Sequence, residues 1–278
     1  MLENKTLAFI GAGSMAESII GGLLSEQLVS PEQIVVTNKS QQQRLDELQK
    51  RYDVQTTSSN KAAVEKADIV ILAFKPKHAA EGISTIKGST TDKHLIISVL
   101  AGLSTGYIEQ LFEKETPVIR AMPNTSSKVN ASATALCKGY YTNAYHLDMS
   151  SVLFQAIGTV TTIEESKMDA VTGISGSGPA YFYYLVEAMQ TAATEAGLPD
   201  KEAKELIVQT LHGAAKRLQQ TEKTPHDLYQ EVMSPGGTTE AAFTLFKHHR
   251  LQEHFQEGIQ EAINRSKELG ASTKSPLT

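Results

Sequence analysis

The feature that most constrains the fold is a glycine-rich turn near the start of the chain. An apolar run at residues 7–10 leads directly into Gly11-Ala12-Gly13-Ser14-Met15-Ala16, and a helical pattern follows at 15–26. A strand, a G-x-G-x-x-A turn and a helix in this order form the beginning of a βαβ unit. The glycines allow a tight turn, and the small Ala16 lets the helix pack closely on the strand. The chain is therefore expected to begin with a parallel α/β fold.

The same turn is suited to hold a phosphate group. Backbone N–H groups at a helix N-terminus are unpaired and carry a partial positive charge, and glycine lets them approach a pyrophosphate closely. We therefore predict that Gly11, Gly13, Ser14 and Met15 bind a dinucleotide cofactor. A purely structural turn is the alternative, but the place of this turn within repeated βα units favours a cofactor site.

Strand and helix patterns alternate as far as about residue 163. Apolar, β-branched runs predict strands at 7–10, 34–37, 69–73, 95–99, 118–121, 133–137 and 160–163. Continuous apolar runs such as 69–73 are typical of strands covered on both faces. After Glu164 only helical periodicity remains, and residues 272–278 have the composition of a loose tail. The fold class is thus α/β, with a Rossmann dinucleotide-binding domain at 1–163 and an all-helical domain at 164–278.

Composition excludes several classes of function. A net charge of -5 with 21% charged residues provides no basic field for nucleic acid. The only cysteine is Cys137, so no intrachain disulfide and no cysteine cluster for zinc can form. The eight histidines show no metal-binding spacing, and we expect no metal. No stretch is apolar enough to suggest a membrane span, and the first residues lack a secretory signal, so a cytoplasmic location is expected.

The end of the second strand bears on the choice between NAD and NADP. An acidic side chain there would bind the ribose 2′-hydroxyl of NAD and repel a 2′-phosphate. The sequence instead reads Thr37-Asn38-Lys39-Ser40, with a cation and small polar groups. Asn38, Lys39 and Ser40 therefore favour NADPH. A solvated loop that accepts either cofactor is the alternative, so NADH also remains open.

Three later strand ends are expected to line the same crevice. Ligands of open α/β sheets bind beyond the carboxyl ends of the strands. These ends place small residues or proline where a loop must pass close to a flat ring. The predicted cofactor contacts are Ala73, Lys75, Pro76, Ala101, Gly102 and Pro123.

Two glycine-rich segments of the second half are unusual for plain connections. The first, 173–181, contains Ser175 and enters a helix, and it is interpreted as a loop that approaches a ligand or as a flexible hinge. The second, Ser234-Pro235-Gly236-Gly237-Thr238-Thr239, precedes another helical run. Its bare N–H groups and the helix dipole suit a substrate carboxylate. An ordinary N-cap at Thr238 or Thr239 is the alternative.

These segments together resemble one enzyme family. Residues 228–242, which contain the second segment, are similar to the signature of pyrroline-5-carboxylate reductase. Three other segments also resemble that family. They are the turn at 11–16 followed by Ile19-Ile20-Gly21-Gly22, the pair Lys75-Pro76 and the segment 173–181, and they occur in the same order along nearly the whole chain. The resemblance implies reduction of the cyclic imine 1-pyrroline-5-carboxylate to L-proline by NADPH or NADH, the last step of proline biosynthesis. It also implies a homodimer through interleaved C-terminal helices, often assembled further into a decamer.

The resemblance also implies roles for individual residues. Ser234, Gly237 and Thr238 match a loop that holds the substrate carboxylate, to which our own interpretation adds Gly236 and Ser175. Thr239 matches a threonine whose hydroxyl faces the ring nitrogen, and we expect it to act catalytically, first by orienting the imine. Asn38 and Lys39 match a ribose-phosphate loop, Asn60 matches an asparagine beside the adenosine half, and Ala73, Lys75 and Pro76 match a third-strand loop.

Two other functions are compatible with parts of this pattern. A β-hydroxyacid dehydrogenase also joins a Rossmann half to helices, but its characteristic lysine one turn into the helix is missing after Gly178. A non-catalytic NADP sensor would keep the fold and lack turnover. The sequence leaves open the cofactor preference, the oligomer size beyond the dimer, feedback by proline, and whether a related cyclic imine is the substrate.

Overall fold

The structure is a computed structural model that describes residues 1–272 of the 278-residue chain. These residues form two compact units: unit 1 contains Met1–Ser177 and the residues from Glu261 onward, and unit 2 contains Gly178–Gln260. The expected domain boundary at 163/164 stays a prediction. Of the expected tail, Ser272 ends a helix and 273–278 lie outside the described residues.

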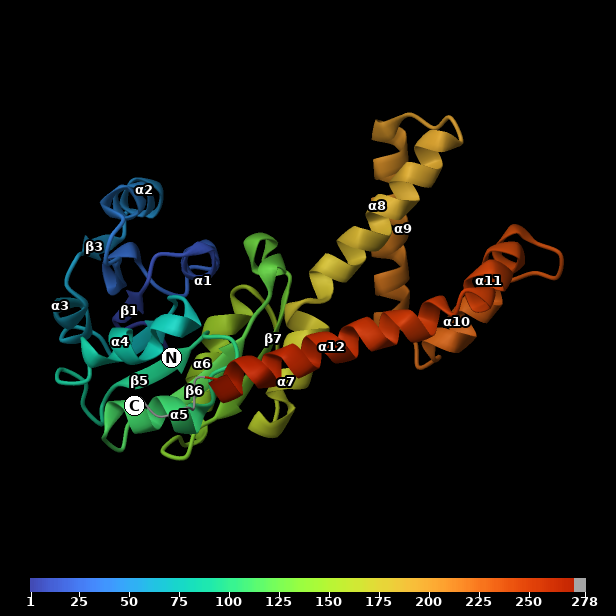
Figure 1. The fold of residues 1–278 in the computed structure, drawn as a ribbon. Coiled ribbons are helices and arrows are strands. Elements are labelled where there is room, and N and C mark those ends of the chain that lie inside the picture. The colour runs from blue at the N-terminus through green and yellow to red at the C-terminus, as the bar shows by residue number, and fades with distance from the viewer. Residues whose placement is uncertain (273–278) are drawn as a thin grey trace. The chain divides into compact units, whose positions relative to one another are not determined.

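Unit 1 is built on one mixed sheet (Figure 1). Within the described residues it has eight strands in the order β3-β2-β1-β4-β5-β6-β7-β8, and only the pairing of β6 with β7 is antiparallel. The order 3-2-1-4-5-6 is that of a Rossmann fold. The strands are β1 Leu7–Ile10, β2 Ile34–Thr37, β3 Gln55–Thr57, β4 Ile69–Leu72, β5 Leu95–Ser98, β6 Val118–Met122, β7 Ser132–Lys138 and β8 Gly158–Thr162.

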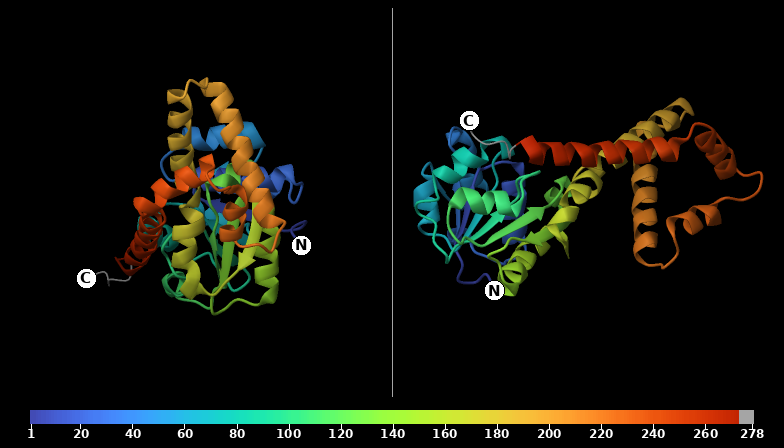
Figure 2. Two further views of the ribbon diagram at one scale, coloured as in Figure 1. Left: turned by 90° about the vertical axis from the view of Figure 1, so that its right-hand side faces the viewer. Right: turned by 60° about the horizontal axis from the view of Figure 1, so that its bottom comes forward.

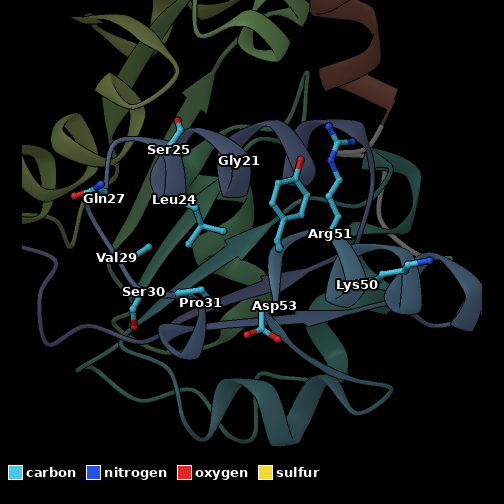
Figure 3. Close-up of a pocket in the computed structure, with 11 residues that line it drawn as sticks. Gly21, Leu24, Ser25, Gln27, Val29, Ser30, Pro31, Lys50, Arg51 and Asp53 are labelled. Carbon is cyan, nitrogen blue, oxygen red and sulfur yellow. The ribbon is translucent and has the colours of Figure 1, made fainter.

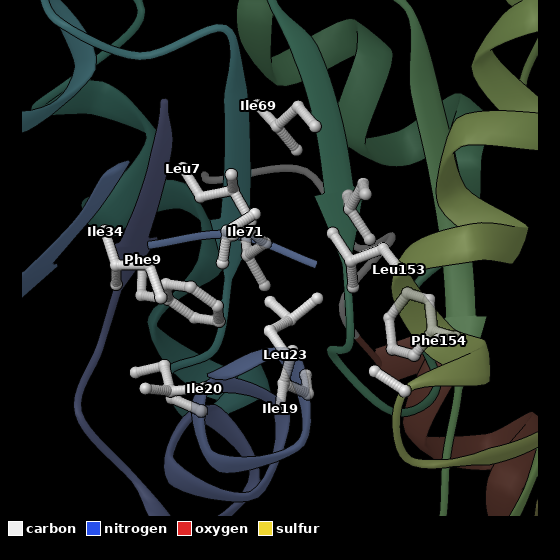
Figure 4. Packing of buried hydrophobic residues seen from close by; sticks show 14 of the residues in the cluster. Leu7, Phe9, Ile19, Ile20, Leu23, Ile34, Ile69, Ile71, Leu153 and Phe154 are labelled. Carbon is white, nitrogen blue, oxygen red and sulfur yellow. The ribbon is translucent and has the colours of Figure 1, made fainter. Parts of the chain in front are cut away.

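Helices cover both faces of this sheet. One face carries α1 Ser14–Ser25, α2 Gln42–Tyr52 and α6 Ala144–Gln155, and the other carries α3 Asn60–Val64, α4 Ala79–Ser84 and α5 Thr105–Phe112. Alternate residues of β1 enter the two cores: Phe9 packs with Ile20 and Leu23 of α1 (Figure 4), whereas Ile10 packs on the opposite side. The central strands are fully buried, which confirms the expectation from their continuous apolar runs.

All seven expected strands are present: two have the predicted ends, and the ends of the other five differ by one or two residues. Strand β3, Gln55–Thr57, is not predicted from the sequence. This strand has three residues, polar side chains and partial exposure, so it carries no apolar pattern. It is held by parallel pairing with β2.

Short helices complete unit 1. They are the 3₁₀ turns η1 Pro31–Gln33, η2 Pro76–His78, η3 Thr125–Val129 and η4 Glu165–Lys167, the helix α7 Met168–Val171 and the π-helical turn η5 Thr172–Gly176.

The segment around Ser175 is not the loop that its glycines suggested. α7, η5 and α8 follow one another almost without a break between 168 and 195. The Ser177 N–H bonds to the Thr172 carbonyl oxygen at 2.9 Å, which keeps the backbone helical. A Cβ on Gly173 would lie 2.5 Å from Ile263 Cγ1 of the last helix. Glycine is therefore required here by close packing.

Unit 2 is entirely helical in the described residues. It contains α8 Gly178–Glu195, α9 Asp200–Gln219, α10 Pro225–Val232, α11 Thr238–His248 and the first part of α12 Leu251–Ser272. α8 packs against α9 (Figure 2), and the turn between them contains Gly197 at φ 88°. Thr224 caps α10, and Pro225 occupies the first position of that helix.

Candidate functional site

The predicted cofactor residues of unit 1 meet at one edge of the sheet. Ile10 at the end of β1 pairs with Thr37 of β2 on one side and with Leu72 of β4 on the other. Leu72 in turn pairs with Ser98 of β5. The loops after these strands therefore begin side by side, at the point where the strand order reverses. This is where open α/β sheets bind ligands.

Gly11 makes the closest approach at this edge. Its φ is 111°, and a Cβ there would lie 2.6 Å from the Ala73 carbonyl oxygen and 3.0 Å from the Phe74 nitrogen. The Gly11 N–H also donates to the Thr37 carbonyl oxygen at 3.1 Å. Only glycine fits, because both the space and the backbone angle exclude a side chain.

The N-terminus of α1 is left without a side-chain cap. Its N-cap residue is Gly13, whereas Ser59 and Ser104 accept N–H bonds at the starts of α3 and α5. The first N–H groups of α1, including those of Ser14 and Met15, thus face the crevice with the positive end of the helix dipole. Such an end is an anion site of the kind that a pyrophosphate occupies.

Arg44 of α2 supports this turn from the side of the sheet that carries α1. Its Nε donates to the Ala12 carbonyl oxygen at 3.0 Å, and its guanidinium forms an ion pair with Glu17 of α1. Burial acts to raise the pKa of Glu17, but the bonds from Arg44 and Arg51 outweigh it and lower the pKa overall. Arg44 is not among the residues predicted from the sequence, because no local spacing links it to a carbonyl group 32 residues away.

The loop after β2 is ordered by its own side chains. Asn38 Oδ1 accepts the N–H groups of Ser40 and Gln41 at 3.1 and 3.0 Å. Thr37 Oγ1 donates to Asn60 Oδ1 at 2.6 Å, so the structure brings Asn60 to the end of β2. Lys39 is exposed and forms an ion pair with Glu81 of α4.

The other predicted cofactor residues follow β4, β5 and β6. Ala73 adjoins Gly11, Lys75 is the exposed N-cap of η2, and Pro76 begins that turn. Ala101 and Gly102 follow β5, where Gly102 has a φ of 77° and its carbonyl oxygen lies 2.6 Å from a Cβ built on Gly270. Pro123, directly after β6, is buried.

Asn124 joins the crevice to Ser175. Its Nδ2 donates to the Ser175 carbonyl oxygen at 3.1 Å, and its Oδ1 accepts the Ser126 N–H at 3.0 Å. Ser175 Oγ donates to the Ala133 carbonyl oxygen at 2.9 Å. Asn124 is not among the residues predicted from the sequence, although an asparagine at the start of a helical turn is a typical N-cap. The π-helical turn is thereby fixed beside the end of β6.

The segment 234–237 of unit 2 is a tight turn. Pro235 and Gly236 occupy its centre, Gly236 has a φ of 72°, and the Gly237 N–H donates to the Ser234 carbonyl oxygen at 2.9 Å. Proline followed by a residue with positive φ defines a type II turn. A Cβ on Gly237 would lie 2.9 Å from the Ser234 carbonyl oxygen, so close backbone packing disfavours a side chain here as well.

The turn already holds one carboxylate. Glu240 Oε2 accepts the Gly236 N–H at 2.7 Å. Gly237 is the N-cap of α11 and no side chain caps that helix, so Thr238 and Thr239 occupy its first two positions. Neither threonine is therefore the N-cap that the alternative interpretation required. The first N–H groups of α11 are suited to a second anion.

Other reactive groups do not extend these sites. Burial, followed by the charge of Glu165, raises the pKa of Cys137 to about 12, so its thiol is no nucleophile at neutral pH. Within residues 1–272, no three metal-ligating side chains gather at one point, and no helix is long and apolar enough to cross a bilayer. A surface hollow of about 780 Å³ lies at the far ends of α1 and α2, beside Leu24, Pro31 and Asp53 (Figure 3), and it contains none of the predicted residues.

Comparisons with known proteins agree over the whole chain. A family model described as pyrroline-5-carboxylate reductase dimerisation matches residues 165–269, and one described as NADP oxidoreductase coenzyme F420-dependent matches residues 6–102. Pyrroline-5-carboxylate reductase 1 of Bacillus subtilis (strain 168) is 42% identical, with 100% of this chain and 95% of the relative covered.

Two solved structures share the fold from end to end. A pyrroline-5-carboxylate reductase from Coxiella burnetii has a TM-score of 0.86 at 36% identity and covers 96% of this chain and 99% of its own. The Plasmodium falciparum pyrroline carboxylate reductase with NADP bound has a TM-score of 0.89 at 26% identity, with the same coverage. Identity and coverage at this level show that this chain belongs to the pyrroline-5-carboxylate reductase family.

Proposed function

We propose that this protein reduces 1-pyrroline-5-carboxylate to L-proline with NADPH as the hydride donor. The observation that carries the proposal is the 42% identity to a reductase of this name over the whole chain.

The crevice of unit 1 fits a dinucleotide. Gly11 and Gly13 leave room for a pyrophosphate, the uncapped start of α1 offers N–H donors, and Asn38 and Lys39 stand at the end of β2. The other proposed cofactor contacts are Ser14, Met15, Ser40, Asn60, Ala73, Lys75, Pro76, Ala101, Gly102 and Pro123. The cofactor, when bound, supplies the hydride from its nicotinamide ring.

The turn of unit 2 fits the carboxylate of the substrate. Ser234 and Thr238 would hold that group through their hydroxyls and the first N–H groups of α11, and Gly237, which lacks a side chain, would keep the turn tight beside it, without an arginine. The bond between the Gly236 N–H and Glu240 supports this role, because it shows that a carboxylate is compatible with the turn. Ser175 of unit 1 is the further substrate contact in this proposal.

The protein has little chemistry to supply beyond orientation. A protonated C=N bond is electron-poor and accepts a hydride without a metal. Fixing the imine carbon at one orientation lowers the barrier by converting an encounter into an oriented step. We assign the Thr239 hydroxyl to the ring nitrogen, where it orients the imine and, with water, conducts a proton. Thr239 is half-buried, and its hydroxyl does not cap α11.

Assembly into a homodimer is part of the proposal. Among the described residues, unit 2 buries few large apolar side chains, and many others are exposed, including Tyr183 at 66%, Tyr184 at 73% and Leu206 at 60%. Apolar surface of this extent is typical of an interface. We assign it to the dimer formed by the C-terminal helices, with the decamer as a further assembly. A cytoplasmic location fits the single free cysteine.

Steady-state NADPH oxidation with 1-pyrroline-5-carboxylate tests the proposal. Imine-dependent oxidation should exceed the rate with 3-hydroxy acids and NADP⁺ in the reverse direction. Tight NADPH binding without imine turnover would instead indicate a sensor, and oxidation of a 3-hydroxy acid would indicate a β-hydroxyacid dehydrogenase. Sedimentation analysis of the same preparation measures the oligomer.

A further inference from the structure

A carboxylate from a distant segment of the chain lies beside Lys39, at the predicted 2′-phosphate site. The loop after β2 carries no acidic residue of its own. Glu81, which lies 42 residues further on in α4, forms an ion pair with Lys39 Nζ. Its second oxygen, Oε2, lies 3.4 Å from His78 Nδ1. Glu81 therefore contacts both Lys39, the one basic residue of the loop after β2, and His78, which lies three residues before it.

The position of Glu81 is fixed by the packing of α4. A Cβ on the next residue, Gly82, would lie 2.7 Å from the Phe74 ring, so α4 sits directly against the loop after β4. At the other end of the helix, Asn60 Nδ2 donates to Thr85 Oγ1 at 3.0 Å. Asn60 is in turn bonded to Thr37 at the end of β2. Asn60 thus links the end of β2 to the C-terminal end of α4.

The ion pair favours the charged form of Glu81. The hydrogen bond from Lys39 lowers the pKa of Glu81 below its usual range, so the carboxylate is ionised at neutral pH. The side chains of Lys39 and Glu81 are 79% and 54% exposed, which makes the pair weak and accessible to a competing anion.

This arrangement affects the two cofactors differently. A 2′-phosphate at the end of β2 must compete with the Glu81 carboxylate for the ammonium group of Lys39. A ribose that carries only a 2′-hydroxyl has no need of Lys39. We propose, on the basis of the proposed function, that Glu81 is a specificity-determining residue that weakens the preference for NADPH over NADH by holding Lys39.

The test compares the two cofactors in four proteins: the unaltered enzyme, Glu81→Gln, Lys39→Met and the double variant. Two quantities are measured for each protein. One is the ratio of kcat/KM for NADPH to that for NADH, and the other is the ratio of the Kd values of NADP⁺ and NAD⁺ from titration calorimetry. The binding titration needs no turnover, so it remains informative even if the imine is not the substrate.

Glu81→Gln should raise the preference for the 2′-phosphorylated cofactor by about threefold to tenfold in both ratios. Lys39→Met should lower the preference, and adding Glu81→Gln to that variant should change it by less than about twofold, because the partner of Glu81 is gone. Glu113→Gln is the matched control: it removes an exposed carboxylate that pairs with Lys87 at 2.5 Å, away from the β2 loop. It should leave both ratios unchanged.

Two results would overturn the proposal. An unchanged preference in Glu81→Gln would show that the pair does not act on the 2′-phosphate. An equal gain with and without Lys39 would show that Glu81 does not act by holding that lysine. If the enzyme does not turn over the imine but the variants still differ in their NADP⁺ to NAD⁺ binding ratios as expected, only the proposed function is contradicted.

Discussion

The carbonyl oxygen of Ala73 lies 2.6 Å from the position that a Cβ on Gly11 would occupy. This contact joins the glycine-rich turn to the loop after β4, at the centre of the proposed cofactor crevice. Gly11→Ala should therefore lower the free energy of unfolding by about 2 kcal/mol or more, because both the contact and the φ of 111° oppose a side chain. Thermal or chemical unfolding measures this loss, and an unchanged stability would contradict the geometry.

Gly13→Ala should have a different outcome. A Cβ on Gly13 would meet nothing nearer than the Ala73 oxygen at 3.8 Å, and its φ of -75° suits any residue. The stability should change by less than about 0.5 kcal/mol. NADPH affinity should still fall about tenfold or more, since the added methyl group occupies space for the pyrophosphate. Fluorescence titration with NADPH checks the affinity, and wild-type binding in Gly13→Ala would remove Gly13 from the site.

Asn124→Asp isolates the bond to Ser175. Aspartate keeps the oxygen that accepts the Ser126 N–H, but it loses the Nδ2 donor to the Ser175 carbonyl oxygen. We expect a loss of about 1–3 kcal/mol in stability and a lower kcat with the imine, while NADPH affinity stays within about twofold.

Asn143→Asp provides the control for this substitution. Asn143 caps α6 by accepting the His146 N–H at 3.1 Å, and aspartate caps a helix as well as asparagine does. A loss of stability and turnover in Asn143→Asp equal to that in Asn124→Asp would mean that the effect is not specific to the π-helical turn.

Thr239→Ala should remove the group that orients the imine. The expected loss in kcat/KM is about 10²-fold, with NADPH affinity unchanged. Thr239→Ser retains the hydroxyl and should stay within about tenfold of the parent enzyme. Because Gly237 is the N-cap of α11, the helix should keep its stability in both variants. Equal kcat/KM values for the alanine and serine variants would rule out a role for the hydroxyl.

The pH dependence of stability should reveal Asp68. Its carboxylate accepts Lys5 Nζ and the Thr6 N–H, both at 2.9 Å, at the start of β1 and β4. Burial acts to raise its pKa, but these bonds outweigh burial and lower the pKa overall. A lowered folded pKa stabilises the protein above the unfolded value of about 3.9, and the gain is lost as the pH falls through the folded pKa.

Asp68→Asn should therefore cost about 1 kcal/mol at pH 7, a modest value because the side chain is 38% exposed and screened by solvent. The difference from the parent protein should shrink as the pH falls below about 4. Urea unfolding at several pH values measures it. A difference that is the same at pH 7 and pH 3 would contradict the assignment.

The sequence predicts the sheet of unit 1 well because each central strand is an apolar run that is buried on both faces. It fails at β3, whose polar side chains are held only by backbone pairing with β2. It also fails at η5, where Gly173 serves to pack against Ile263, 90 residues away. Long-range packing of this kind leaves no local pattern.

The candidate site divides in the same way. Gly11, Gly13 and Pro235 act through backbone geometry that short motifs encode, so they can be read from the sequence. Other contacts depend on the fold, and no sequence spacing indicates them. They join Arg44 to Ala12, Asn124 to Ser175 and Glu81 to Lys39.

Isotope transfer tests whether the hydride of NADPH reaches the imine carbon. The enzyme would be incubated with 1-pyrroline-5-carboxylate and NADPH that carries deuterium at the transferable C4 position, and the product would be analysed by mass spectrometry. The account predicts L-proline with one deuterium at C5, formed in a one-to-one ratio with the NADP⁺ produced. NADPH oxidation without labelled proline, or no oxidation at all, would contradict it.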